Sequence, residues 1–418
     1  MRFSSIEQWL EWQETLHPSA IDLGLERPGK VLRKLDLEFP QHTVITVAGT
    51  NGKGSSVAML ESILLAAGYR VGCYTSPHLL HYNERIRING ESVADTAICE
   101  AFERIDQARG DTSLTYFEFG TLAAFELFAR ADLDVAVLEV GLGGRLDAVN
   151  LLDADVALVT AIDVDHTAWL GDDREAIGKE KAGIFRSGSA AVCSDPQPPQ
   201  SVLEHAAELN TPLSLLGRDF RYQQDGENWC WEGARSLSPL PLPALRGRFQ
   251  LQNAAGVVQV LELLSERLPV SLQHLRQGLL AVKLPGRFQV LPGEVPLIVD
   301  VAHNPQAAAS LAANLKQMPV AGKTRAVVAM LADKDQAAVV RELLPVVDHW
   351  YVAGLDVWRG SDAASMAAAV AAQSTTPPRV FEGLDEALQQ ARHEAEAGDR
   401  IVVFGSFYTV AAALAASV

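Results

Sequence analysis

Apolar residues in the first part of the chain, up to about residue 190, form two kinds of pattern in alternation. Residues 43–48 (TVITVA), 135–140 (VAVLEV) and 156–162 (VALVTAI) are short apolar runs rich in β-branched side chains, as in strands buried on both faces. Residues 55–67 instead carry apolar side chains at helical spacing, and Gly68 ends the pattern. The alternation predicts a mostly parallel sheet with helices on both faces.

A second series of alternating elements follows a proline- and glycine-rich stretch at residues 284–296 (LPGRFQVLPGEVP), which is typical of a joint between domains. The expected strands are 297–301, 325–331, 350–353 and 401–404, and the expected helices are 306–316, 336–344, 362–372, 384–397 and the alanine-rich tail 408–418. Between the two series, residues 195–248 are rich in proline and polar side chains and predict irregular structure with a few antiparallel strands. Helical patterns then cover 252–268 and 272–281.

The length of 418 residues favours two domains, since a single core rarely grows that large. We therefore expect an α/β protein with a mostly parallel sheet domain at residues 1–288. A smaller, Rossmann-like α/β domain is expected at residues 289–418.

Charge and cysteine content narrow the class of protein. The formal net charge of −17 disfavours broad binding to nucleic acid or to anionic membranes, since both require a positive field. The four cysteines are scattered and form no C-x-x-C pair, which fits a reducing compartment. The first residues lack the apolar run of a secretory signal, and no segment approaches the roughly 20 apolar residues of a membrane span. We expect a cytoplasmic protein.

Residues 47–56 (VAGTNGKGSS) resemble a phosphate-binding loop but break its usual pattern, G-x-x-x-x-G-K-[ST]. Val47 stands where the first glycine belongs, and Gly54 stands where the metal-binding hydroxyl belongs. The context of strand, glycine loop and helix still favours backbone N–H groups around phosphates, with Lys53 supplying a full positive charge. The alternative is a glycine turn beside an exposed lysine.

Two further strand ends carry polar candidates. Glu139 closes the run 135–140, where a carboxylate can bind magnesium beside a phosphate loop, and the alternative is an ion pair with a core arginine. Asp163, Asp165 and His166 follow the run 156–162 and should emerge at the same sheet edge. Because magnesium prefers oxygen ligands, His166 alone would be interpreted as a base or an outer-shell group.

Two polar segments beyond these strand ends remain ambiguous. The loop 74–90 combines the Ser76 hydroxyl with two histidines and two arginines, which suits an anion or a metal, although a surface loop is the alternative. The run 173–185 (DREAIGKEKAGIF) contains Lys179 and Lys181, and a solvated helix face explains it equally well.

The second domain repeats the same arrangement. Residues 298–305 (IVDVAHNP) are a strand that delivers Asp300, His303 and Asn304 at its end, and Arg287 lies in the preceding joint. These residues could act on a nucleotide bound by the first domain. For Asn304, which precedes a proline, a helix N-cap is the alternative and is compatible with that role.

Seven motifs occur in one order: AGTNGKGSS, YTSPHL, LEVGLGGRLDAVN, DHTAWLG, GKEKAGIF, LPGRFQ and DVAHNP. Together they resemble the folylpolyglutamate synthase and dihydrofolate synthase family of the Mur ligase superfamily, over nearly the whole chain. The resemblance implies that residues 1–288 form a P-loop domain like the Mur ligase central domain. Residues 289–418 would close over the nucleotide and bind glutamate.

The resemblance also implies an activity: ATP-dependent ligation of L-glutamate to dihydropteroate and to the γ-carboxyl group of reduced folates, through an acyl phosphate. The partners are then these small molecules, and a monomer is expected. A monofunctional folylpolyglutamate synthase, another Mur-type amide ligase, a P-loop kinase and a nucleotide switch are the alternatives. A muramyl-peptide ligase would carry a UDP-binding domain ahead of the loop, where 48 residues precede Gly49.

Site residues follow from the same resemblance. The ATP contacts are Gly49, Thr50, Asn51, Gly52, Lys53, Gly54, Ser55, Asn253, Arg287 and Asp300. Two Mg²⁺ ions are expected on Ser76, Glu139, His166 and Lys181, the last matching a family lysine that is often carbamylated. The pterin contacts are Asp22, Thr115, Tyr116, Phe117, Glu118, Leu146, Asp147 and Ala148. Lys53, Lys181 and His303 are the expected catalytic residues.

Overall fold

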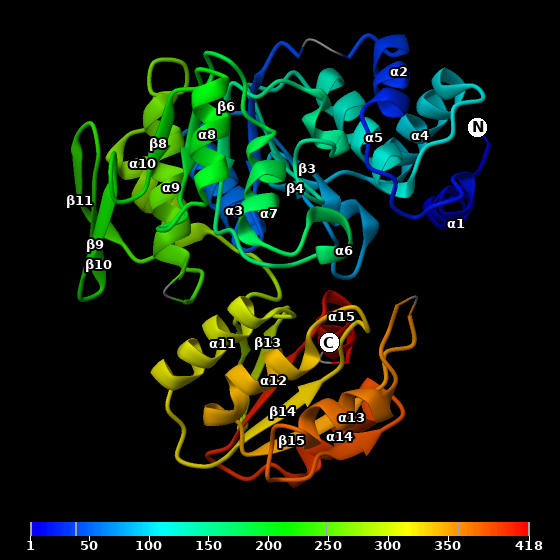
Figure 1. The fold of residues 1–418 in the computed structure, drawn as a ribbon, viewed down its shortest axis with the longest axis vertical. Helices are drawn as coiled ribbons and strands as arrows, with labels where there is room; N and C mark the ends of the chain where they lie inside the picture. The colour runs from blue at the N-terminus through cyan, green and yellow to red at the C-terminus, as the bar shows by residue number, and fades with distance from the viewer. Residues whose placement is uncertain (1, 38–39, 248, 358, 417–418) are drawn as a thin grey trace. The chain divides into compact units, whose positions relative to one another are not determined.

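The computed structural model describes residues 2–37, 40–247, 249–357 and 359–416, and the chain divides into two compact units (Figure 1). Unit 1 comprises Met1–Ala244 and Leu251–Val282, and unit 2 comprises Leu245–Gln250 and Lys283–Val418. The changeover at Val282 lies close to the expected joint. Unit 1 is therefore discontinuous in sequence, since residues 245–250 belong to unit 2.

Unit 1 is built on a large sheet of eight strands within the described residues, in the order β4-β3-β2-β5-β1-β6-β7-β8. Neighbours from β2 to β8 run parallel, and β3 and β4 form an antiparallel edge. The strands are β1 (Thr43–Ala48), β2 (Val71–Tyr74), β3 (Ile86–Ile88), β4 (Glu91–Ser92), β5 (Val135–Glu139), β6 (Val156–Val159), β7 (Ala190–Cys193) and β8 (Leu213–Leu215). The mostly parallel α/β architecture is confirmed.

Helices cover both faces of this sheet, because side chains alternate along each strand. The helices described in this unit are α1 (Ile6–Leu16), α2 (Glu26–Lys34), α3 (Lys53–Ala66), α4 (Asp95–Arg109), α5 (Tyr116–Arg130), α6 (Thr167–Leu170), α7 (Arg174–Ala182), α8 (Gln200–Glu208), α9 (Phe249–Leu263) and α10 (Leu272–Ala281), of which α1 and α2 pack on α4 and α5. Ala157 and Val159 of β6 join a core that includes residues of α4, α5 and α7. Leu158 points to the other face, towards Gly256 of α9.

On that second face, α3 and α10 pack with their backbones close together. A Cβ on Gly278 of α10 would lie 2.5 Å from the Ile63 Cα of α3. The Ser62 hydroxyl donates a hydrogen bond to the Gly278 carbonyl oxygen at 2.8 Å. Glycine at position 278 is therefore what allows the two helices to approach.

The prediction of irregular structure over residues 195–248 is only partly correct. An antiparallel sheet of β9 (Arg221–Asp225), β10 (Asn228–Glu232) and β11 (Ser236–Pro241) lies there as expected, with Trp229 and Trp231 buried. However, residues 200–215 do not form a loop: α8 is a helix, and β8 adds a parallel strand beside β7 to the large sheet. The short elements and the flanking prolines concealed them, because three residues in β8 give little periodicity.

Unit 2 is a smaller α/β unit with the strand order β12-β13-β17-β14-β15-β16, in which β12 alone of the described strands pairs antiparallel. The strands are β12 (Gln289–Leu291), β13 (Leu297–Asp300), β14 (Thr324–Val328), β15 (His349–Ala353), β16 (Arg379–Phe381) and β17 (Arg400–Phe404). The helices are α11 (Pro305–Gln317), α12 (Gln336–Leu343), α13 (Ala363–Ala371), α14 (Leu384–Glu394) and α15 (Phe407–Ala415). The expected strands and helices of this half are present, and β12 and β16 are additional.

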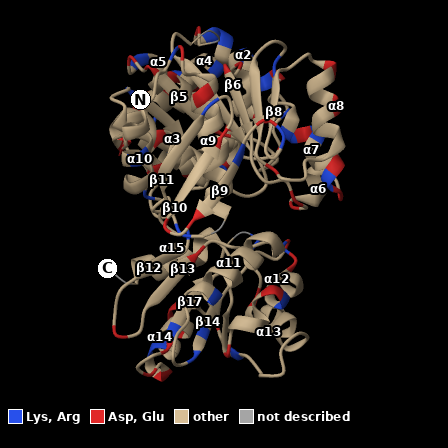
Figure 2. Cartoon of the chain, turned by 90° about the vertical axis from the view of Figure 1, so that its left-hand side faces the viewer, with Lys and Arg blue, Asp and Glu red and all other residues tan. Residues whose placement is uncertain are grey.

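Charged side chains of both signs are interspersed over the helices in the view of Figure 2. None of the helices in the described part of the chain combines the length and the apolar character that crossing a membrane requires.

Candidate functional site

The loop between β1 and α3 has the geometry of a phosphate-binding loop. Gly49 and Gly52 have φ values of 151° and 94°, which L side chains rarely adopt. The Lys53 Nζ donates hydrogen bonds to the carbonyl oxygens of Gly49, at 2.9 Å, and Thr50, at 3.3 Å. The ammonium group thus folds back over the loop at the N-terminus of α3, where a helix favours anions. Lys53 is partly buried and is not the exposed lysine of a simple turn.

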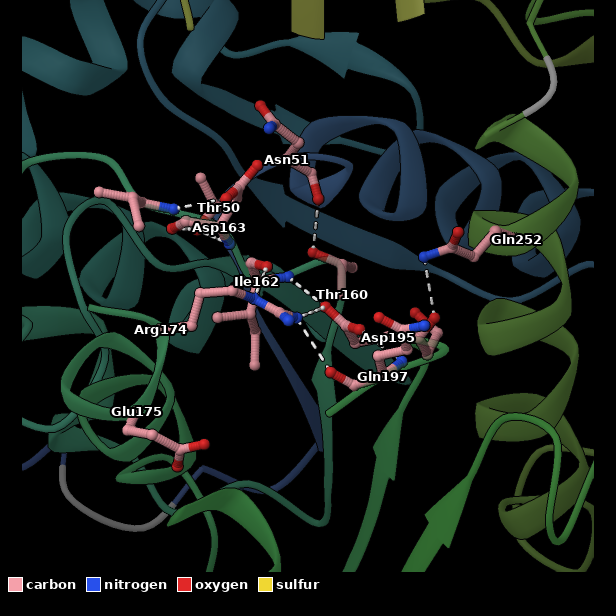
Figure 3. Close-up of polar contacts among 12 residues, drawn as sticks. Thr50, Asn51, Thr160, Ile162, Asp163, Arg174, Glu175, Asp195, Gln197 and Gln252 are labelled. Carbon is pink, nitrogen blue, oxygen red and sulfur yellow. Dashed lines mark hydrogen bonds and ion pairs between the residues drawn. The ribbon is translucent and has the colours of Figure 1, made fainter. Parts of the chain in front are cut away.

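The end of β6 holds this loop from the side (Figure 3). The Thr160 Oγ1 donates to the Asn51 carbonyl oxygen at 2.8 Å. A Cβ on Gly49 would lie 1.8 Å from the same hydroxyl oxygen, so only glycine fits there. The Thr50 hydroxyl donates to the Asp163 carbonyl oxygen at 2.9 Å and accepts the Asp163 N–H at 3.0 Å. The neighbouring strand therefore determines the conformation of the loop.

Asn253 on α9 lies directly against the loop. A Cβ on Gly52 would be 2.4 Å from the Asn253 Oδ1. Asn253 itself is 4% exposed. The structure thus brings this expected nucleotide contact to the glycine that precedes Lys53, although the two residues are about two hundred positions apart in the sequence.

Glu139 and Ser76 also come together. Glu139 is the last residue of β5 and is buried, and its Oε2 accepts the Ser76 N–H at 3.2 Å. Arg87 forms an ion pair with Glu61, at 2.7 Å between Nη2 and Oε2, and the Glu139 carboxylate also helps to raise the pKa of Arg87. The structure thus brings together Glu139, at the end of β5, and Ser76, which follows the neighbouring strand β2.

His166 occupies an unusual backbone conformation. It has a φ of 54°, in the left-handed region, at the start of the short helix α6. Its N–H donates to the Asp165 Oδ1 at 2.8 Å. Non-glycine residues in this region are uncommon and concentrate at functional sites.

Lys181 is buried, with 4% of its surface exposed, whereas Lys179 on the same helix, α7, is exposed. The solvated-helix interpretation is therefore wrong for Lys181. Burial, followed by the positive charge of Lys53, lowers the pKa of Lys181 to about 7. The carboxylates of Asp165 and Asp147 act in the opposite direction.

Asp147 shares this environment. It is 2% exposed, and burial raises its pKa to about 7 in spite of the opposing charge of Lys53 and backbone N–H groups. Its oxygens accept the N–H groups of Leu142, at 2.8 Å, and Val149, at 2.9 Å. Asp147 therefore fixes the glycine-rich loop after Glu139.

The residues fit a magnesium ion that is bound together with phosphate. Within the described residues, no three His, Cys, Asp or Glu side chains converge to form a complete metal site. Mg²⁺, however, is usually bound by one or two protein carboxylates, with water and phosphate oxygens completing its shell. Ser76 and Glu139, which the structure brings together, offer a hydroxyl and a carboxylate for such an incomplete protein contribution.

Two of the expected pterin contacts, Asp22 and Glu118, are joined by Arg27. This side chain donates from Nη1 to the Asp22 Oδ2 at 2.6 Å and from Nη2 to the Glu118 Oε1 at 3.0 Å. Thr115 and Glu118 form a capping box at the start of α5, and burial raises the pKa of Glu118. Phe117 lies against the glycine loop, since a Cβ on Gly141 would be 2.5 Å from its ring.

The expected nucleotide residues of unit 2 form a compact group of their own. Asp300, at the end of β13, accepts the N–H groups of Phe288 and Ala302, both at 2.8 Å. His303 donates from Nδ1 to the Val301 carbonyl oxygen at 2.8 Å, which leaves Nε2 unprotonated in the neutral ring. The Arg287 guanidinium lies 4.9 Å from the centre of the Phe407 ring. Asn304 caps α11 as expected, accepting the Ala307 N–H at 2.9 Å.

Sequence reasoning missed Arg27, Thr160 and Asp195. Asp195 follows β7 at the same sheet edge as Glu139, so the strand-end rule that selected Glu139 would also have selected it. Thr160 directly follows β6, and its place inside the expected run 156–162 concealed it. Arg27 gives no such signal, because its importance lies in contacts between segments far apart in the sequence.

Two parts of the chain match known protein domain families. Residues 47–261 match the Mur ligase middle domain, and residues 286–407 match the Mur ligase, glutamate ligase domain. The chain is 45% identical to the dihydrofolate synthase/folylpolyglutamate synthase of Escherichia coli K12, over 98% of this chain and 94% of that protein. It is 42% identical to the Haemophilus influenzae protein of the same name, over 98% and 96% of the two chains.

Solved structures agree with these matches. Escherichia coli FolC in complex with DHPP and ADP has a TM-score of 0.95 and 44% identity, covering 99% of this chain and 98% of that one. A bifunctional folylpolyglutamate synthase/dihydrofolate synthase with Mn, AMPPNP and L-glutamate bound has a TM-score of 0.92 and 48% identity, with the same coverage. The resemblance seen in the seven motifs is confirmed, and the chain belongs to the dihydrofolate synthase/folylpolyglutamate synthase family of ATP-dependent Mur ligases.

Proposed function

We propose that the chain ligates L-glutamate to dihydropteroate, forming dihydrofolate, and to the γ-carboxyl group of reduced folates. In each reaction the acceptor carboxylate takes the γ-phosphoryl group of ATP, so that ADP leaves and an acyl phosphate forms. The amine of glutamate then attacks the acyl carbon, loses a proton and displaces phosphate. A carboxylate is a poor acyl donor, and phosphorylation converts one of its oxygens into a good leaving group.

The loop around Lys53 supports this chemistry. Positioning and charge neutralisation account for most of the catalysis of phosphoryl transfer. In this proposal, residues 49–55 bind the phosphates through backbone N–H groups, and the Lys53 ammonium balances charge on the β and γ phosphates. The hydrogen bonds of Lys53 to Gly49 and Thr50 show that its side chain already lies at the loop.

Ser76, Glu139 and His166 are the proposed magnesium ligands. When bound, the ion supplies positive charge to the phosphate oxygens and orients them. The hydroxyl missing beside Lys53, at Gly54, is thereby replaced by a hydroxyl from another strand end.

Lys181 is the proposed site of a carbamate. Its burial and its neighbour Lys53 favour the neutral amine near pH 7. A neutral amine can attack CO₂, forming an N–C bond and releasing a proton, and the product is an anionic oxygen ligand. A second magnesium ion on that carbamate is part of the proposal.

The two halves of the chain have different proposed roles. Residues 1–288 bind ATP, with Asp22, residues 115–118 and residues 146–148 contacting the pterin. Residues 289–418 bind glutamate, a role supported by the family description matched at residues 286–407. Asn253, Arg287 and Asp300 are proposed nucleotide contacts, and His303 is a proposed catalytic group.

The observation that carries the proposal is the phosphate loop itself, in which the Lys53 ammonium folds back onto the carbonyl oxygens of Gly49 and Thr50 at the start of α3. Its test is the release of ADP by the purified enzyme with Mg-ATP and L-glutamate, comparing dihydropteroate with a reduced folate. We expect glutamate-dependent ADP release with both co-substrates and a mass increase of one glutamyl residue in each product.

The other outcomes separate the alternatives. Release of ADP with the reduced folate alone would indicate a monofunctional folylpolyglutamate synthase. ADP release that does not require glutamate would indicate a kinase, and no co-substrate-dependent release would contradict the proposal.

We also propose that the protein acts in the cytoplasm as a monomer. The cysteines Cys73, Cys99, Cys193 and Cys230 are all free thiols, which agrees with a reducing compartment. Light scattering during size-exclusion chromatography tests the monomer, and a mass of twice 45.1 kDa would contradict it.

A further inference from the structure

Asp195 is a buried carboxylate to which the proposed reaction assigns no role. It follows β7, and β6 separates β7 from β1, the strand that leads into the phosphate loop. Asp195 is 3% exposed. Its Oδ2 accepts the Ile162 N–H at 2.7 Å and an Arg174 Nη2–H at 3.1 Å, and its Oδ1 accepts the Gln197 N–H at 2.8 Å. A carboxylate this deeply buried is stable only with such a full set of donors.

Asp195 and Arg174 together hold Ile162 from both sides (Figure 3). While Asp195 accepts the Ile162 N–H, the Arg174 Nε donates to the Ile162 carbonyl oxygen at 3.0 Å. Arg174 is also anchored to the β7 end through the Gln197 carbonyl oxygen at 3.0 Å. Ile162 is therefore tied to β7 on both of its backbone groups.

This attachment extends to the phosphate loop. Asp163, the next residue, exchanges two hydrogen bonds with the Thr50 hydroxyl, and Ala161 accepts the Thr50 N–H at 2.8 Å. His166 lies three residues beyond Asp163. The segment that Asp195 holds thus carries both the partner of the phosphate loop and a proposed magnesium ligand.

The same strand end also anchors α9. The Gln252 Nε2 donates to the Ser194 carbonyl oxygen at 2.9 Å, and Gln252 precedes Asn253, the residue that lies against Gly52. Ser194 and Asp195 therefore connect the two segments that flank the phosphate loop.

We propose that Asp195 is a positioning residue of the ligase, which acts through Ile162 and Arg174 to hold residues 160–166 in the arrangement that binds the metal–nucleotide complex. The proposal rests on the proposed function for its metal and nucleotide. It assigns to Asp195 no contact with substrate or with the reacting atoms.

A matched control exists at the opposite edge of the same sheet. Asp155, which precedes β6, accepts the Val44 N–H at 2.8 Å and an Arg267 Nη1–H at 2.5 Å. It makes the same kind of bridge between a backbone N–H and an arginine. The Asp155 side chain is 32% exposed, against 4% for Asp195, and it lies at the ends of β1 and β6 that are far from the loop. Asp155→Asn therefore measures the effect of losing such a bridge away from the loop.

The test compares Asp195→Asn, Arg174→Gln and Asp155→Asn in the full-length enzyme. Amide hydrogen exchange of residues 160–170 is measured without ligands, and Mn²⁺ affinity is measured by electron paramagnetic resonance in the presence of AMPPNP. We expect faster exchange and about tenfold weaker Mn²⁺ binding in Asp195→Asn, a loss typical for groups that orient metal ligands. Asp155→Asn should match wild type in both measurements.

Steady-state kinetics add a separate readout. We expect a lower kcat for Asp195→Asn with an unchanged KM for dihydropteroate, because the pterin contacts lie on other segments. Wild-type Mn²⁺ affinity and exchange in Asp195→Asn would overturn the proposal, as would equal losses in Asp155→Asn.

Two provisions keep the test decisive. Should Asp195→Asn fail to fold, Arg174→Gln replaces it, since Asp195 then keeps the N–H donors of Ile162 and Gln197 while the Ile162 carbonyl oxygen loses the Arg174 donor. Unchanged exchange and Mn²⁺ binding in Arg174→Gln would then overturn the proposal. A wild-type enzyme without glutamate-dependent ADP release would contradict the proposed function instead, while the exchange measurement would still decide the role of Asp195.

Discussion

Lys53 and Lys181 lie close enough for the positive charge of one to lower the pKa of the other. Lys53 belongs to the phosphate loop, and Lys181 is buried on α7. Two like charges in a poorly solvated region are unfavourable, so a site of this kind is suited to receive anions. The first predictions concern this relationship.

Replacement of Lys181 by alanine should lower the rate of glutamate ligation in a way that short carboxylates partly restore. If the side chain carries a carbamate, then acetate or propionate can place an oxygen ligand in the space left by Lys181→Ala. The measurement is ADP release with and without the added acid, and Lys179→Ala, at an exposed position of the same helix, is the control. An absence of any recovery would contradict the carbamate but not the importance of the lysine.

Replacement of Lys181 by methionine should stabilise the ligand-free protein more at pH 6 than at pH 9. In the wild type the pKa of Lys181 is about 7 when folded and near 10.5 when unfolded, so burying the ammonium costs most below pH 7. Between about pH 7 and pH 10.5 the folded protein is neutral at Lys181, and only the unfolded chain holds the proton. The cost therefore decreases as the pH rises, because removing that proton becomes easier. Thermal unfolding in CO₂-depleted buffer measures the difference, and a gain that grows with pH would disprove the assignment.

Replacement of Lys53 by alanine should lower kcat by roughly 10²- to 10³-fold, as for the loss of one preorganised charge at a transition state. The fold should be retained, since Lys53 bonds to backbone oxygens of its own loop and is only partly buried. Circular dichroism checks folding and ADP release checks turnover. Near-normal ligation by a folded Lys53→Ala enzyme would refute the phosphate-binding role.

Replacement of Glu139 by alanine should shift the requirement for metal to higher concentrations as well as lower turnover. Loss of this buried carboxylate would remove the only charged side chain among the three proposed ligands, which the Ser76 hydroxyl and the His166 imidazole cannot replace. A titration of activity with Mg²⁺ measures the shift. An unchanged half-saturating Mg²⁺ concentration would mean that Glu139 does not bind the ion.

Replacement of Gly52 by alanine should weaken nucleotide binding, and Gly68→Ala should not. Both glycines have positive φ values, 94° and 88°, so alanine costs about 1 kcal/mol in either backbone. Only at Gly52 would the new Cβ meet another side chain, the Asn253 amide, whereas nothing lies within 4 Å at Gly68. Calorimetric titration with AMPPNP separates the two, and equal losses of affinity would contradict the contact.

The central strands β1, β5 and β6 of unit 1 and β13, β14, β15 and β17 of unit 2 could be predicted because their apolar runs are strong and local. Residues 43–48 were expected as a strand, and β1 has the same bounds. The N-terminal helices α1 and α2 gave weaker signals, and β16 is too short and too exposed at Val380 to show a period. A periodic pattern of apolar residues becomes visible only over several helical turns or several pairs of strand residues, and short elements are not long enough to show one.

Site residues at strand ends were predictable for a related reason. Parallel strands deliver their last residues to one edge, which selects Glu139 and the residues after β6 without any knowledge of contacts. Arg27 could not be found in this way, since it joins Asp22 to Glu118 across 91 residues of sequence. The burial of Lys181 likewise depends on what covers α7, and its charged neighbours in the sequence suggest exposure.

The packing of α10 on α3 has a consequence for biosynthesis. Helix α3 begins at the phosphate loop, and Gly278 of α10 packs against Ile63 of this helix. Asn253 of α9 lies against the loop itself, at Gly52. A ribosome that has released only the first 244 residues has made all the strands of the large sheet but neither of these helices. The nucleotide site is therefore completed late in translation, and we expect a nascent chain truncated before residue 250 to bind ATP poorly even where its sheet has formed.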